Sequence, residues 1–166
     1  MEIVQQIERH NAIIEGTEKI INNWEIDKSL FFNKKFQQVS IGEICILEYG
    51  DSLPETKRRK GKYPVIGAGK IIDYHNEYLT SKPAITIGRR GATSGRVLWV
   101  DEHCFPIDTA FYVINILPNK LNYKFLYYSL KILDLMKLQS GSAMPGVNRN
   151  DIYNQKINLP NLEEQK

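Results

Sequence analysis

Basic residues gather in two stretches of the sequence that contain no acidic residue. The first stretch holds Lys57, Arg58, Arg59, Lys60, Lys62 and Lys70. The second has Arg89, Arg90 and Arg96 among glycines. Each phosphate that a lysine or arginine neutralises releases counterions from a polyanion, so clustered cations favour nucleic-acid binding. This clustering is a stronger indication than the formal net charge of +3.

Two segments have the composition of loops that contact DNA. Residues 88–96 combine glycines, which permit close backbone approach, with the hydroxyls of Thr93 and Ser94 and with arginines that match a guanine edge. Residues 139–149 supply residue types suited to adenine and phosphate contacts, namely Ser140, Ser142, Asn148 and Arg149. We predict that Arg89 and Arg90 read bases and that the 57–60 run contacts phosphates.

Each of these segments also has a purely structural interpretation. Residues 53–62 can be a solvated turn, and residues 88–96 a simple hairpin. Asn148 can cap a helical turn that starts at Asn150 and Asp151. The sequence leaves these alternatives open.

Catalytic interpretations find less support in the sequence. The glycine turn over 65–69 is followed by β-like residues, whereas a cofactor turn needs a helix there. Asp101-Glu-His-Cys104 places a carboxylate, an imidazole and a thiol in succession, but neighbours on a strand point to opposite faces. The sequence has no P-loop, no adenine-pocket motif and no spaced metal ligands. We expect no catalytic residue, metal or cofactor in this chain.

The elements that must position these loops follow from the apolar pattern. Residues 1–24 predict one long amphipathic helix whose narrow stripe includes Ile3, Ile7, Ile14 and Ile21. Such a helix is unstable alone, so we expect it to pack on a partner helix; packing on its own domain is the alternative.

Residues 25–166 predict a compact domain. Short β-branched and aromatic runs between Gly and Pro indicate a strongly turned, mostly antiparallel β region over 63–114, after a helical turn and a strand within 36–49. A helix over 121–138, a loop over 140–149, a helical turn at 150–153 and a strand over 156–160 complete it. The fold class is therefore α+β, with one long N-terminal coiled-coil-type helix and short helices in the domain.

Cysteine use and hydropathy indicate a cytosolic protein. Cys45 and Cys104 lack the spacing of a metal or redox pair, and we expect two reduced core thiols. No apolar run approaches the length of about 18 residues that a membrane span requires, and the polar start lacks the build of a signal peptide.

An ordered set of segments resembles the target-recognition domain of type I restriction–modification specificity subunits. The set covers most of residues 36–166 and comprises 39–44, 61–67, 69–76, 84–91, 94–97, 104–112, 140–152 and 157–166. The resemblance implies a non-catalytic subunit whose two recognition domains are held apart by helices in an antiparallel coiled coil. Each domain would read half of a split site on double-stranded DNA.

The resemblance also implies partners. DNA methyltransferase subunits would bind the helices and carry S-adenosylmethionine, and restriction (nuclease) subunits would complete a restriction complex. One recognition domain in this chain fits either the distal half of a larger subunit or a half-subunit that forms a homodimer through its N-terminal helix. The alternatives are the recognition part of a fused restriction–methyltransferase enzyme, or a helix-mediated assembly module without DNA specificity.

Overall fold

The computed structural model describes residues 35–141 and 143–166. The helix predicted over residues 1–24, with its isoleucine stripe, lies outside these residues and stays a prediction. Ser142 lies outside them as well.

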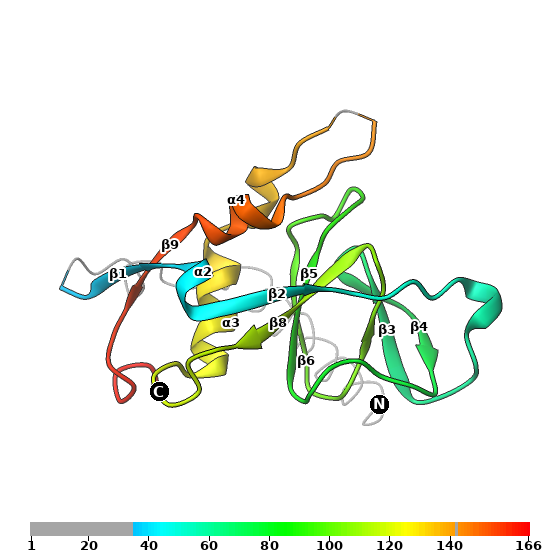
Figure 1. Cartoon of the computed structure of the whole chain (residues 1–166), viewed down its shortest axis with the longest axis horizontal. Helices are drawn as coiled ribbons and strands as arrows, with labels where there is room; N and C mark the ends of the chain where they lie inside the picture. Colours follow the sequence, from blue (N-terminus) through cyan, green and yellow to red (C-terminus); the bar gives the residue numbers. More distant parts are fainter. Residues whose placement is uncertain (1–34, 142) are drawn as a thin grey trace, which may run out of the picture. The chain divides into compact units, whose positions relative to one another are not determined.

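A four-stranded antiparallel sheet forms the centre of the fold (Figure 1). Its strands, in spatial order, are β2 (Cys45–Tyr49), β8 (Ala110–Asn115), β5 (Ala84–Gly88) and β6 (Val97–Val100). Successive side chains of a strand point to opposite faces, so Ile85 and Ile87 share one face of β5, and both are fully buried. The apolar runs predicted as strands from the sequence lie in this sheet and in the one beside it.

A smaller three-stranded sheet lies next to the central sheet. It contains β4 (Lys70–His75), β3 (Tyr63–Gly67) and the short β7 (Phe105–Pro106), with β3 antiparallel to β4 and parallel to β7. Ala68 and Gly69 both have positive φ, as a two-residue turn between twisted strands requires. The glycine turn over 65–69 thus closes a hairpin, which agrees with the β interpretation of the residues that follow it.

Helices cover one face of the central sheet and enclose the main core. They are α3 (Tyr123–Ile132), the 3-10 helix η3 (Leu135–Leu138) and α4 (Arg149–Tyr153). Buried residues of α3, Leu126 and Leu130, share a core cluster with Ile85 and Ile87. The prediction of one helix over 121–138 is wrong in its extent, because Asp134 adopts a left-handed conformation with φ of 50° and divides it.

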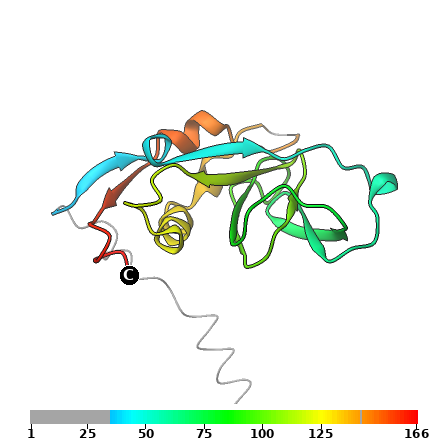
Figure 2. The same cartoon turned by 60° about the horizontal axis from the view of Figure 1, so that its bottom comes forward.

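The two ends of the described chain meet in a short antiparallel ladder. Strand β1 (Gln37–Ser40) pairs with β9 (Lys156–Leu159), and the short helix α2 (Ile41–Ile44) leads from β1 into β2. This ladder and the β3–β4 hairpin lie at opposite ends of the described structure in both views (Figure 1, Figure 2).

Both cysteines are free and buried, as predicted. Burial raises the pKa of the Cys45 thiol to about 12 and that of the Cys104 thiol to about 11. Because the thiolate is the reactive form, neither side chain is suited to nucleophilic chemistry. In the part of the chain that the structure describes, no helix is long and apolar enough to cross a membrane.

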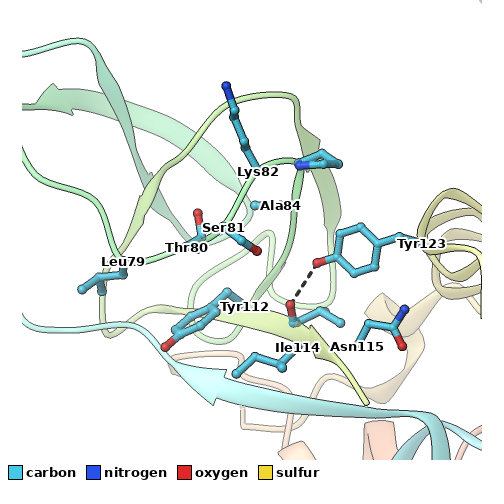
Figure 3. A pocket seen from close by; sticks show the side chains of 11 residues that line it. Leu79, Thr80, Ser81, Lys82, Ala84, Tyr112, Ile114, Asn115 and Tyr123 are labelled. Carbon is cyan, nitrogen blue, oxygen red and sulfur yellow. Dashed lines mark hydrogen bonds between the residues drawn. The ribbon is translucent and has the colours of Figure 1, made fainter. Parts of the chain in front are cut away.

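The hydroxyl group of Tyr123 completes the central sheet where β5 and β8 separate. The ladder between these strands ends at the pair Thr86–Tyr112. Beyond it, the Tyr123 hydroxyl accepts a hydrogen bond from the Ile85 N–H (3.2 Å) and donates one to the Val113 carbonyl (2.9 Å; Figure 3). A cavity of about 470 Å³ lies beside it, between residues 79–84 and β8. Burial raises the pKa of Tyr123 to about 12, so the hydroxyl keeps the proton that it donates.

We predict that Tyr123→Phe lowers the free energy of unfolding by about 2–3 kcal/mol, because two backbone groups in the sheet lose their partner. Urea unfolding followed by circular dichroism measures the change. Tyr127→Phe is the matched control, since the Tyr127 ring packs nearby against Trp99 and no hydrogen bond of its hydroxyl is found among the described residues. Equal stability of the two variants would contradict the role given to the Tyr123 hydroxyl.

Candidate nucleic-acid interface

The two loops predicted to contact DNA are joined by backbone hydrogen bonds. The Gly91 N–H donates to the Pro145 carbonyl (2.8 Å), and the Val147 N–H donates to the Arg89 carbonyl (2.9 Å). Ser140 and Gly146 exchange two further bonds of 2.9 Å each, which close the second loop on itself. Figure 1 shows residues 139–141 and 143–147, in orange, projecting beside the connection between β5 and β6. Segments far apart in the sequence therefore form one surface.

A hollow of about 430 Å³ lies where these loops meet the end of β2. Five of the residues predicted from the sequence line it, namely Arg89, Arg90, Ser140, Asn148 and Arg149. Met144, which also lines the hollow, is 67% exposed. The loop pairing thus gathers cations that the sequence places in separate segments.

Tyr49 is a member of this site that sequence analysis missed. The guanidinium carbons of Arg89 and Arg149 each lie 4.8 Å from the centre of its ring. Opposite Tyr49 in the β2–β8 register lies Phe111, and the two rings pack at 5.2 Å. An aromatic residue at the end of a strand and next to a glycine was the available signal, but the sequence does not reveal which loops reach it.

The three arginines of the hollow differ in how firmly they are held. Arg89 donates from Nη1 to the Asp108 carbonyl (2.7 Å), and Arg149 donates from Nη1 to the Leu47 carbonyl (3.4 Å). Arg90 is exposed, and its guanidinium has no hydrogen-bond or ion-pair partner among the described residues. Two guanidinium groups are therefore fixed in place, whereas the third is free to adapt to a ligand.

Of the polar residues predicted to contact DNA, one is buried in the fold and two form hydrogen bonds within it. Ser94 is fully buried, so its hydroxyl cannot reach DNA, and that prediction is corrected. Thr93 donates its hydroxyl proton to the Ala68 carbonyl and ties the 88–96 loop to the β3–β4 turn. The Asn148 side chain accepts from the Asn150 N–H (2.8 Å), which confirms the capping alternative.

The remaining predicted cations lie at the two ends of strand β4. Near its last residue, His75, lie Arg58, Arg59 and their neighbours Lys57 and Lys60, around the 3-10 helix η2 (Glu55–Lys57). Lys70 begins the strand, and Arg96 packs against the adjoining turn at Gly69. Five steps of about 3.3 Å along the strand separate the two groups by about 17 Å. These remaining cations thus form two clusters, in addition to the arginines of the hollow.

Arg58 is less available to a ligand than its neighbours. Its side chain is 17% exposed and forms an ion pair of 3.2 Å with Asp73. The Tyr74 N–H and Arg58 both hold the pKa of the Asp73 carboxyl below its usual range, so this carboxylate stays charged. Arg59 is held by its backbone, whose N–H donates to Nδ1 of His75 (2.9 Å). Lys57, Arg59 and Lys60 keep exposed side chains.

The carboxylate, imidazole and thiol at residues 101–104, considered above as catalytic groups, are explained by the fold. Residues 101–102 form a bend that leads to the buried Cys104, whose amide N–H donates to the Thr80 hydroxyl (2.9 Å). His103 lies within 2.7 Å of the Thr80 carbonyl through Nδ1 and stacks on Tyr78. Within residues 35–141 and 143–166, no group of side chains has the composition of a metal site.

These features define a class of protein: a mixed α/β domain, mostly antiparallel, that presents cationic loops on a preformed backbone. Residues 33–166 match the family described as the type I restriction modification DNA specificity domain. The chain belongs to this family, as the ordered segments of its sequence predicted.

Two curated relatives agree with this assignment. The chain is 25% identical over 151 residues to the type I restriction enzyme EcoprrI specificity subunit of Escherichia coli, covering 86% of this chain and 37% of that protein. It is 30% identical over 161 residues to a putative type I specificity subunit of Mycoplasma pneumoniae, covering 89% of this chain and 50% of that protein. The chain thus spans at most half the length of these relatives.

Solved structures share the fold. The S subunit of a type I restriction–modification system from M. genitalium matches with a TM-score of 0.67 at 23% identity, over 76% of this chain and 35% of that chain. The HsdS subunit from Thermoanaerobacter tengcongensis matches with a TM-score of 0.61 at 20% identity, over 99% of this chain and 44% of that chain.

We predict that Gly95→Ala lowers the free energy of unfolding by about 2 kcal/mol or more, because it combines backbone strain with a steric clash. Gly95 has a φ of 86°, and a Cβ atom there would lie 2.6 Å from the backbone of Leu135. Gly91→Ala is the matched control, since its φ is also positive but its nearest contact would be 3.5 Å. Urea unfolding compares the two variants. An equal loss in both would show that the close approach to η3 is unimportant.

Proposed function

We propose that this chain is a DNA target-recognition module of a type I restriction–modification specificity subunit. It binds double-stranded DNA at a defined sequence and directs DNA methyltransferase subunits, and restriction subunits where they are present, to that site. The observation that carries the proposal is the pairing of the 88–96 and 139–149 loops, which collects three arginines in one hollow of a domain that belongs to this family.

The free arginine of the hollow and the cation clusters at the ends of β4 fit different parts of a duplex. An exposed and unpartnered arginine can form the two-pronged contact with guanine, so Arg90 is the leading base-reading residue. Lys57 and Lys60 lie near one end of β4, and Lys70 and Arg96 lie near the other, and these two ends are about 17 Å apart along the strand. A major groove is about 12 Å wide, so such a separation allows the clusters to contact phosphates on both of its sides.

Catalysis belongs to the partners in this proposal. S-adenosylmethionine binds to the methyltransferase subunit, and this chain holds no cofactor. Support comes from the glycine turn at Ala68 and Gly69, which closes a hairpin, and from the buried thiols. Free buried thiols also fit the reducing cytoplasm, where we place the complex. The predicted helix over 1–24 is the proposed contact to a partner helix, in a second copy of this chain or within a longer subunit.

We predict that the chain, mixed with its cognate methyltransferase subunit, selects one motif from random-sequence duplexes and that its affinity falls steeply with salt. Arg90→Ala should lose about tenfold to a hundredfold of the discrimination at one base pair, because a guanine contact is removed. Binding is measured by fluorescence anisotropy across a salt series.

The control for this experiment is Lys156→Ala, on strand β9 at the end of the domain away from the β3–β4 hairpin. This variant should keep the preference. If the wild-type complex selects no motif, the recognition proposal fails and an assembly role through the predicted helix becomes the better account.

A further inference from the structure

The hollow beside Tyr49 is lined by cations and by no described carboxylate. Arg89, Arg90 and Arg149 line it, and no carboxylate is among the described residues that do so. Neither Arg89 nor Arg149 forms an ion pair within the described part of the chain, although both are partly buried. Cations held together in this way favour an anionic ligand over the neutral edge of a base.

Arg89 and Arg149 also keep hydrogen-bond donors for such a ligand. A guanidinium group has five N–H donors, and one hydrogen bond to a backbone carbonyl is found for each of these two side chains. An oxyanion in the hollow would accept from their remaining Nη donors, whereas the Nε atom of Arg149 is buried and has no partner among the described residues.

The shape of the site points to the same ligand. In a duplex the phosphodiester backbone protrudes, whereas the base edges are recessed in the grooves. A hollow of about 430 Å³ therefore complements the backbone. A projecting segment, such as the one that carries Met144 at 67% exposure, complements a groove.

Contact with the Tyr49 ring explains why the side chains of Arg89 and Arg149 are held in fixed positions. Both guanidinium groups lie over its ring at 4.8 Å, a distance at which a cation is attracted to the face of an aromatic ring. Arg89 also donates to the Asp108 carbonyl, and Arg149 donates to the Leu47 carbonyl. Little side-chain freedom is then left to lose when a ligand binds.

We propose that this hollow is a preformed binding site for one phosphodiester group of the target DNA, with Arg89 and Arg149 as its ligands and Tyr49 as the positioning residue. The inference rests on the proposed function and deepens it. It moves Arg89 from the base-reading role predicted from the sequence to a phosphate contact, and it leaves base reading to Arg90. The site anchors the domain on the duplex and is insensitive to sequence.

The test measures coupling between a side chain and one phosphate. The full chain in complex with its methyltransferase subunit is titrated against the selected duplex, in which one phosphate at a time is replaced by a neutral methylphosphonate. With the wild-type chain, substitution at one particular phosphate should weaken binding about tenfold, and with Arg149→Ala the same substitution should have little further effect. Arg149→Ala should also weaken binding to all duplexes alike and reduce the salt slope by about 1.

Two variants isolate the role of Tyr49. Tyr49→Phe keeps the aromatic face and should bind within about twofold of wild type, whereas Tyr49→Leu should show the coupling loss and the uniform weakening of Arg149→Ala. Thermal unfolding checks that each variant is folded. Should Arg149→Ala prove unfolded, Arg149→Lys, which keeps the charge but not the planar fork, carries the same coupling experiment.

The outcomes separate this inference from the proposed function. If the wild-type complex selects no motif, the proposed function itself fails. If it selects a motif but no methylphosphonate couples to Arg149, the phosphate site is refuted and recognition stands. A change of preferred base at one position in Arg149→Ala, with an unchanged salt slope, would likewise refute it, because that result identifies a base contact. Wild-type behaviour of Tyr49→Leu would remove Tyr49 from the site.

Discussion

The candidate interface depends on a few backbone hydrogen bonds between residues 89–91 and 145–147. Joining loops so distant in the sequence costs conformational entropy, which the packed sheet and helices behind them offset. Strands β5 and β6 present one loop, and η3 and α4 flank the other. Without this junction Arg89 and Arg149 would not share the ring of Tyr49, and the hollow would not exist.

Rigid and adaptable parts lie side by side on this surface. Arg89 and Arg149 are held by carbonyls and by an aromatic ring, whereas Arg90 projects without a partner among the described residues. Phosphates occur at regular positions on any duplex, so a fixed site suits them. Base edges differ between sequences, and a side chain with several accessible rotamers can follow them. Fixed arginines therefore suit phosphates, and a free arginine suits base edges.

Local patterns predicted much of the fold and less of the site. The runs 84–87 and 97–100 are strands because their β-branched and aromatic residues suit a sheet, and Asn148 caps a helical turn because its side chain bonds locally. The burial of Ser94 and the place of Tyr49 depend on contacts between distant segments. Local composition carries no signal for these, so Ser94 was predicted as a surface contact and Tyr49 was missed.

The pairing of the two loops also bears on how this domain can evolve. Backbone N–H and carbonyl groups are common to nearly all residue types, so the bonds at Gly91, Pro145 and Val147 place few demands on the exposed side chains beside them. Substitution of Arg90 or Met144 changes the side chains that face DNA, while the backbone hydrogen bonds between the two loops persist. A lineage can therefore acquire a new target preference through point mutations, without an intermediate generation that has lost the folded scaffold.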